Sequence, residues 1–96
     1  MNNKVYIIVG VYNGDSVYSI MSRYCVKSTL EDAKEELKLI EKEITSDYED
    51  NGMSADWLTF KHGETSLKVI YGNDDEEIYT IEERIIDYGK EVNSNE

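Results

Sequence analysis

The sequence predicts a single two-layer α+β domain in which a long amphipathic helix packs on one face of an antiparallel sheet. Two patterns lead to this prediction. Runs rich in Val, Ile and Tyr alternate with period two near both ends of the chain, and one segment between them repeats its apolar residues every three or four positions. The expected order is strand, strand, helix, strand, strand, strand. At 96 residues there is room for one domain, with an ordered core over about 3–88 and a frayed tail over 89–96.

The first two strands are expected at residues 4–12 and 17–27, on either side of "NGDS". Asn-Gly between apolar runs is a strong hairpin signal because both residues tolerate a positive φ. With a loop of two or four residues, odd positions of the first strand share a face with even positions of the second, whereas a loop of three residues reverses this. The first alternative groups these residues on one face: Val5, Ile7, Val9, Val11, Tyr18, Ile20, Tyr24 and Val26.

Tyr6, Ile8, Tyr12 and Met21 would lie on the opposite face of this hairpin, together with Gly10, Val17, Ser19, Arg23 and Cys25. This face is half apolar, although a sheet face that meets solvent is usually polar. One explanation is that tyrosine is common on exposed strands, where its ring packs on neighbours and its hydroxyl stays hydrated. The other is that a partner or a second copy of the chain covers this face, which makes Tyr6, Ile8, Tyr12 and Met21 a candidate dimer face.

The helix is predicted by "STLEDAKEELKLIEKEITSDYEDNG", which begins at Ser28. Ser28 with Glu31, or Thr29 with Asp32, offers a capping box, and Gly52 marks the end of the helix. One apolar stripe recurs at helical spacing and predicts the face that packs on the sheet: Leu30, Ala33, Leu37, Ile40, Ile44 and Tyr48.

Three shorter strands are expected after the helix. "DWLTFKHG" and "TSLKVIYG" alternate around a "HGET" turn, although a short helix from Ser54 to Phe60 competes with the first of them. Gly72, Asn73 and Asp74 then predict a second hairpin turn, before "EIYTIEERII" resumes period two. The acidic run "NDDEE" therefore lies at a hairpin tip.

Charge and composition argue against several classes of function. Twenty-one Asp and Glu against ten Lys and Arg give a formal charge of −11. Nucleic acids and anionic membranes are bound by clustered Lys and Arg, so neither is expected as a direct partner, and a basic protein fits better. Solubility alone is the competing explanation of the charge. The single cysteine allows no internal disulfide, and the apolar run near the N-terminus is too short for a membrane span, so we expect a cytoplasmic protein.

No arrangement of residues in the sequence points to catalysis, a metal or a cofactor. A nucleophilic site needs a base near a Ser or Cys, and the chain has one histidine, His62 in a predicted turn, and one cysteine, Cys25 on a strand. "DYEDNG" begins a calcium-loop spacing at Asp47, but its twelfth position is Leu58, where a bidentate Glu is required. Paired carboxylates for glycoside hydrolysis need a deep cleft, for which a small sheet has little room. We therefore expect a protein that is not an enzyme.

The acidic surface is the remaining candidate for function. Carboxylates on a rigid domain can imitate the spacing of phosphates and capture a basic groove. Aromatic residues anchor interfaces, so Trp57 is either such an anchor or a residue of the core. Two groups are the candidate partner-binding residues: the tip acids (Asp74, Asp75, Glu76 and Glu77) and the helix-end patch (Glu49, Asp50 and Trp57).

In size, in the stretches "NDDEE" and "DYEDNG", in the helix "LEDAKEELKLIEKE" and in the absence of a catalytic motif, the chain resembles the small acidic anti-CRISPR-type inhibitors that bacteriophages encode. The resemblance is one of general character over the whole chain. It implies a protein of the host cytosol that binds and inhibits a basic, nucleic-acid-binding host protein such as a defence nuclease. The alternative is a self-assembling homodimeric module that forms a small-ligand sensor or sponge pocket.

Overall fold

The computed structural model describes residues 3–14 and 17–86, and their side chains except those of residues 14 and 17–20. The elements follow in the predicted order: β1 (Lys4–Gly14), β2 (Val17–Lys27), α1 (Leu30–Asp50), the short 3-10 helix η1 (Ala55–Trp57), β3 (Thr59–His62), β4 (Ser66–Ile70) and β5 (Glu76–Ile85). The turn at residues 15–16 and the tail predicted to fray over 89–96 lie outside the described residues.

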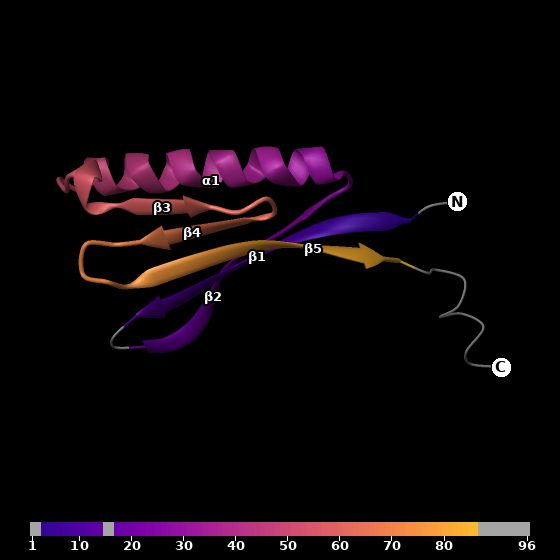
Figure 1. The fold of residues 1–96 in the computed structure, drawn as a ribbon, viewed down its shortest axis with the longest axis horizontal. Coiled ribbons are helices and arrows are strands. Elements are labelled where there is room, and N and C mark those ends of the chain that lie inside the picture. Colours follow the sequence, from indigo (N-terminus) through magenta and orange to yellow (C-terminus); the bar gives the residue numbers. More distant parts are fainter. Residues whose placement is uncertain (1–2, 15–16, 87–96) are drawn as a thin grey trace.

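The strands form one sheet in the order β2-β1-β5-β4-β3, with every neighbouring pair antiparallel, and α1 packs on it (Figure 1). The predicted α+β fold class is confirmed, as are the three predicted hairpins. One pairing is not evident in the sequence: β1 and β5 run side by side from Lys4 opposite Ile85 to Asn13 opposite Glu76. Since α1 leaves β2 at one edge of the sheet and leads to β3 at the other, it is the long connection that crosses the sheet.

The register of the first hairpin shows which face the helix covers. Ile7 lies opposite Val26 and Val9 opposite Tyr24, which confirms the predicted pairing of odd with even positions for this part of the hairpin. Beyond Gly10 the prediction is wrong, because Tyr12 lies opposite Ile20. The face expected to meet solvent is, however, the one under the helix, where Ile8 is 0% exposed and belongs to the core. The fully apolar face of the hairpin is the one that α1 leaves uncovered.

Charge complementarity explains this choice of face. Arg23 and Lys27 lie on the covered face of β2, and both form ion pairs with Glu36 of α1, at 3.7 and 3.4 Å. Arg23 also pairs with Glu43 at 2.8 Å. A helix on the other face of the sheet could not reach these two cations, so the ion pairs favour the observed packing.

A bulge corrects a further expectation about the first hairpin. Gly10 lies opposite Arg23, but Val11 lies opposite Met21, so Ser22 is the extra residue. Met21 consequently lies on the uncovered face and is 64% exposed. The sequence pattern predicts that Met21 shares a face with the tyrosines of β1, and this prediction is wrong.

The helix begins and ends at the predicted signals. The Oγ of Thr29 accepts a hydrogen bond from the backbone N–H of Asp32 at 3.0 Å, which selects the second of the two possible caps. At the other end Asn51 is the C-cap, and Gly52 follows with a φ of 80°, a conformation that favours glycine. The core joins the helix stripe to the covered sheet face: Ile8, Ala33, Leu37, Ile40, Leu58, Leu67, Val69 and Tyr79.

Glycine is required at one position within the sheet. Gly10 of β1 lies opposite Tyr79 of β5, and a Cβ atom at this position would collide with the tyrosine ring. The missing side chain lets the ring of Tyr79 lie across β1, where the ring is almost completely buried.

The segment after the helix combines the two predicted alternatives. η1 falls within the short helix expected from Ser54 to Phe60, and β3 follows it. The Oγ of Ser54 caps this turn by accepting a hydrogen bond from the N–H of Asp56 at 3.1 Å. Trp57 ends the turn and lies against Gly72 of the β4–β5 connection.

Candidate partner-binding site

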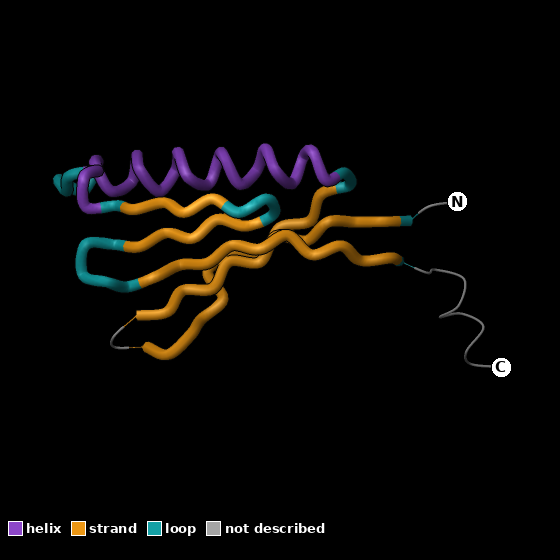
Figure 2. Tube along the Cα trace, in the orientation of Figure 1, coloured by secondary structure: helices purple, strands orange, loops and turns teal. Residues whose placement is uncertain are grey.

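The two predicted acidic groups meet at one end of the molecule. The loop that follows α1 and the turn between β4 and β5 lie at the same end, at the left of Figure 2. They are in contact, because a Cβ atom placed on Gly72 would lie 3.2 Å from the Cβ of Trp57. The tip acids and the helix-end patch therefore belong to a single surface, although Glu49 and Asp50 precede the tip acids by 24 to 28 positions in the sequence.

A pocket of about 600 Å³ lies in this surface. Its volume is within the range of small-ligand sites. Tyrosine rings from three elements line it, with centroids 5.9 Å apart for Tyr48 and Tyr71 and 6.4 Å apart for Tyr12 and Tyr71. The interplanar angles are 42° and 59°, so the rings are tilted rather than stacked. Six side chains dominate the lining: Tyr12, Tyr48, Met53, Trp57, Tyr71 and Asp75.

The tip acids are not all exposed, which corrects the expectation drawn from their position in a hairpin. Asp74 is exposed and adopts a φ of 71° in the turn. Asp75 and Glu77 turn inward, and each is only 8% exposed. The turn is closed by hydrogen bonds from the N–H of Tyr71 to the carbonyl of Asp75 and from the N–H of Asp74 to the carbonyl of Tyr71, both at 2.9 Å.

Neutral side chains donate the hydrogen bonds that hold these two inward carboxylates. The hydroxyl of Tyr12 donates to Asp75, and the amide Nδ2 of Asn73 donates to the same oxygen at 3.0 Å. The hydroxyl of Tyr71 donates to Oε1 of Glu77 at 2.6 Å. Such bonds satisfy a buried carboxylate without cancelling its charge.

The tyrosine hydroxyls near Glu77 stay protonated far above neutral pH. Burial, together with the hydrogen bond to Glu77 and the charge of that residue, raises the pKa of Tyr71. Burial and the charge of Glu77 likewise raise the pKa of Tyr79 to about 12. The rings are therefore neutral at physiological pH, and the negative charge at this end of the molecule comes from the carboxylates.

Lysine, arginine and histidine side chains lie within ion-pair distance of acids in several parts of the protein. Their ion pairs are Lys4 with Glu83, Arg23 with Glu36 and Glu43, Lys27 with Glu36, Lys38 with Glu35, His62 with Glu41, Lys68 with Glu76, and Arg84 with Glu82. Among the tip acids, Glu76 takes part in such a pair. Among residues 3–14 and 17–86, no ion pair reaches Glu49, Asp50, Asp74 or Glu77.

The helix dipole makes this end of the molecule more negative still. The last turn of α1 contains no basic residue, and Asp47, Glu49 and Asp50 lie there. A helix C-terminus carries a partial negative charge, so acids at this position are destabilising where cations would be stabilising. The site thus concentrates negative charge, although the repulsion between these acids and the helix C-terminus is destabilising.

The candidate dimer face is a wrong prediction. Tyr6 and Ile8 pack into the core beneath α1, and Tyr12 lines the pocket and bonds to Asp75. Met21 lies on the other face of the sheet because of the bulge. Alternation within β1 could not reveal this, because both faces of the first hairpin are rich in apolar and aromatic residues.

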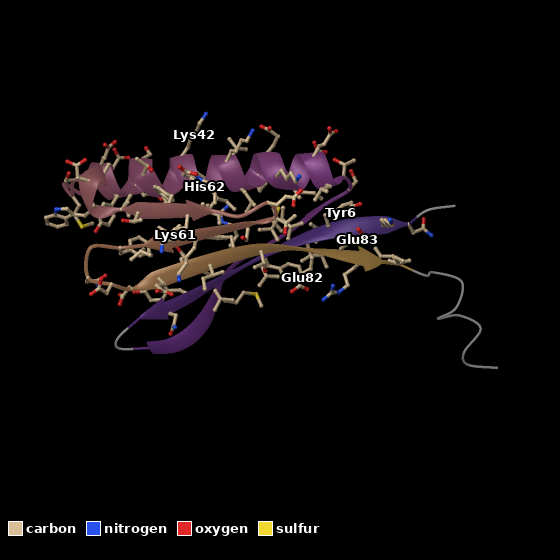
Figure 3. All side chains as sticks on the ribbon, viewed as in Figure 1. Tyr6, Lys42, Lys61, His62, Glu82 and Glu83 are labelled. Atoms are coloured by element: carbon tan, nitrogen blue, oxygen red, sulfur yellow. The ribbon has the colours of Figure 1, made fainter. Side chains whose placement is uncertain are left out.

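The two residues considered for nucleophilic chemistry lie far apart. Cys25 is on β2 and His62 on β3, which are the opposite edges of the sheet, a separation of four strand spacings or roughly 19 Å. His62 lies beside α1, where its Nε2 is 2.6 Å from a carboxylate oxygen of Glu41 (Figure 3). Within the described residues, no three His, Cys, Asp or Glu side chains are grouped so as to hold a metal ion. Nor is any helix there both long and apolar enough to cross a membrane.

Sequence reasoning named Trp57 and the acids that lie at this end of the molecule, but not the set of tyrosines that line the pocket. Strand alternation places Tyr12 on the predicted dimer face, and helical spacing places Tyr48 on the apolar stripe of the helix. Tyr71 offered the best clue, since it directly precedes the acidic turn in "YGNDD".

Comparison with known proteins finds no family model, no curated protein and no solved structure that matches this chain. The functional assignment must therefore be argued from the geometry and charge of the site.

Proposed function

We propose that this protein binds a basic protein through the end at which the tip acids and the helix-end patch meet. Its target would be a nucleic-acid-binding protein of a bacterial host, such as a defence nuclease, which it inhibits by occupying the basic surface that nucleic acid would otherwise contact. The observation that carries this proposal is that two acidic segments converge on one aromatic pocket, and that no ion pair within the described part of the chain reaches Glu49, Asp50, Asp74 or Glu77.

Charge and aromatic side chains would contribute differently to such an interface. The exposed acids Glu49, Asp50 and Asp74 attract a basic surface over long range and accelerate association. Trp57 is 58% exposed at the edge of the pocket and offers an apolar anchor of the kind that dominates binding energy. The acids in the last turn of α1 support the same proposal, because a bound cationic surface would offset their repulsion by the partial negative charge of the helix C-terminus.

The test is affinity capture of the tagged protein from bacterial lysate at low and at high salt, followed by mass spectrometry. A basic protein recovered at low salt and released at high salt supports the proposal, provided that the purified pair then loses nucleic-acid binding in a competition assay. A recovered partner that stays bound at high salt, or that binds nucleic acid equally well in the complex, contradicts it.

Self-association remains a second candidate, and an observation favours it. The face of the sheet that α1 leaves uncovered exposes Met21, Tyr24, Val26 and Ile78. The second candidate is thus a homodimer formed through this face rather than through the one predicted from sequence, and a small-ligand sensor or sponge pocket at its interface would be the corresponding function. Sedimentation at micromolar concentration tests it: a monomer eliminates this candidate.

A further inference from the structure

The aromatic pocket has the composition of a site for an organic cation. Rings from β1, α1, the end of η1 and the β4–β5 connection surround it, and the tilt between neighbouring rings turns their faces in different directions. The face of an aromatic ring carries partial negative charge and attracts cations within about 6 Å of its centre. Several faces around one space therefore favour a cation over a neutral group.

The carboxylates at the pocket strengthen this preference. Asp75 lines the pocket itself, and Glu77 lies directly behind Tyr71, which donates to it. Both carboxylates accept hydrogen bonds from neutral groups, so their charge is not cancelled by these bonds. The hydroxyls of Tyr12 and Tyr71 donate their hydrogens to these carboxylates, so neither hydroxyl hydrogen is left for an anion in the pocket.

We infer that the pocket receives the side chain of an arginine presented by the partner protein. This inference rests on the proposed function and adds to it the chemistry that the pocket recognises. Guanidinium is planar and can stack on Trp57 and the tyrosines. It is also more weakly hydrated than the ammonium group of lysine, so it loses less on leaving water for a pocket lined mainly by rings and by Met53.

Small probes test this inference without knowledge of the partner. The purified full-length chain is titrated with n-butylguanidinium, with n-butylurea, which is its neutral and nearly isosteric counterpart, and with n-butylammonium. Binding is followed by proton–nitrogen NMR at the backbone amides of Gly72 and Asn73. We expect n-butylguanidinium to bind about tenfold more tightly than either other probe. Equal binding of n-butylurea overturns the role of charge, and equal binding of n-butylammonium overturns the choice of arginine.

Two variants locate the site. Trp57→Ala should weaken n-butylguanidinium binding about tenfold. Tyr24→Ala is the matched control, because Tyr24 is also an aromatic residue with 58% of its surface exposed but lies on the uncovered sheet face, and it should change nothing. Asp75→Asn keeps an acceptor oxygen and removes the charge, so it should weaken n-butylguanidinium but not n-butylurea. Unchanged binding in Trp57→Ala, with the same amides still shifted, would overturn the inference.

The outcomes also separate this inference from the proposed function. If a basic partner is captured but binds Trp57→Ala as tightly as the unaltered protein, the proposed function stands and the arginine pocket fails. If n-butylguanidinium binds as expected but no basic partner is recovered from the lysate, the pocket stands and the proposed function fails.

Discussion

Acidic residues lie at both ends of α1, but their surroundings differ. At the N-terminal end Glu31 and Asp32 occupy the first turn, where the helix dipole favours them, and Glu36 of the following turn pairs with two cations of β2. At the C-terminal end Glu49 and Asp50 lie where the dipole opposes them, and no ion pair reaches them within the described part of the chain.

The difference teaches that the acidic composition of this protein has two roles. Acids at the first end are favoured by the helix dipole, and Glu36 pairs with two cations on the sheet face that α1 covers. The acids at the second end slightly lower the free energy of unfolding. Residues that reduce stability are a reason to expect a function at their position. The following experiments test this distinction, beginning with the largest expected effect.

If the proposed basic partner binds this end of the molecule, charge reversal at the C-terminal end of α1 should abolish most of the affinity for it. We expect the double variant Glu49→Lys with Asp50→Lys to bind about 100-fold more weakly at low salt, since like charges across an interface cost several kcal/mol. The measurement is titration calorimetry. The control, Glu31→Lys with Glu64→Lys, changes the net charge equally away from the site and should lose little affinity. Equal losses in the two variants would mean that only the total charge matters.

Alkaline pH should destabilise the fold through Tyr79, which lies on β5 opposite Gly10 of β1. The pKa of Tyr79 is raised from near 10 to about 12 in the folded protein, so its stabilising contribution is complete below pH 10 and disappears as the pH rises through 12. The loss should approach about 1 kcal/mol for each pH unit in this range.

The ion pairs of Arg23 with α1 should persist over that interval. Burial opposes the charge of Arg23, but the hydrogen bond to Glu43 and the charge of Glu43 outweigh it and raise the pKa of Arg23. Urea unfolding between pH 9 and pH 12, monitored with ultraviolet absorbance of tyrosinate, measures both effects. Constant stability across this range would contradict the raised pKa of Tyr79.

Removal of the Tyr71 hydroxyl should destabilise the fold by about 1–3 kcal/mol, because Tyr71→Phe takes away a hydrogen bond to the nearly buried Glu77 carboxylate. Chemical denaturation gives the free energy of unfolding. Tyr24→Phe removes a hydroxyl from an exposed side chain and should stay within about 0.5 kcal/mol of the unaltered protein. If Tyr71→Phe and Tyr24→Phe change the free energy of unfolding equally, a water molecule must replace the lost hydroxyl as the hydrogen-bond donor to Glu77.

The smallest expected effect is on stability, in a direct comparison of the two ends of α1. Asp50→Lys should stabilise the protein by about 0.3–1 kcal/mol, and Asp32→Lys should destabilise it by a similar amount. Thermal unfolding at low ionic strength, where the dipole is least screened, provides the measurement. Changes of the same sign in both variants would show that net charge outweighs the helix dipole.

The β4–β5 hairpin illustrates how far sequence reasoning reaches. Turn chemistry predicted its tip at Gly72, Asn73 and Asp74, and period two predicted the strand that follows. Neither pattern indicated that Asp75 and Glu77 turn inward, because the inward phase of a strand depends on where the helix lies. The burial of these acids is compensated by Tyr12 and Tyr71, which local patterns do not connect to them.

Local rules account for the helix, its caps, the hairpins and the fold class, since each depends on residues a few positions apart. The pairing of β1 with β5, the covered face and the pocket depend instead on contacts between distant segments. Tyr12 and Asp75 are 63 positions apart and meet because β5 lies beside β1. The amino-acid order therefore specifies which residues are acidic and aromatic, and the packing of helix on sheet brings them together into a site.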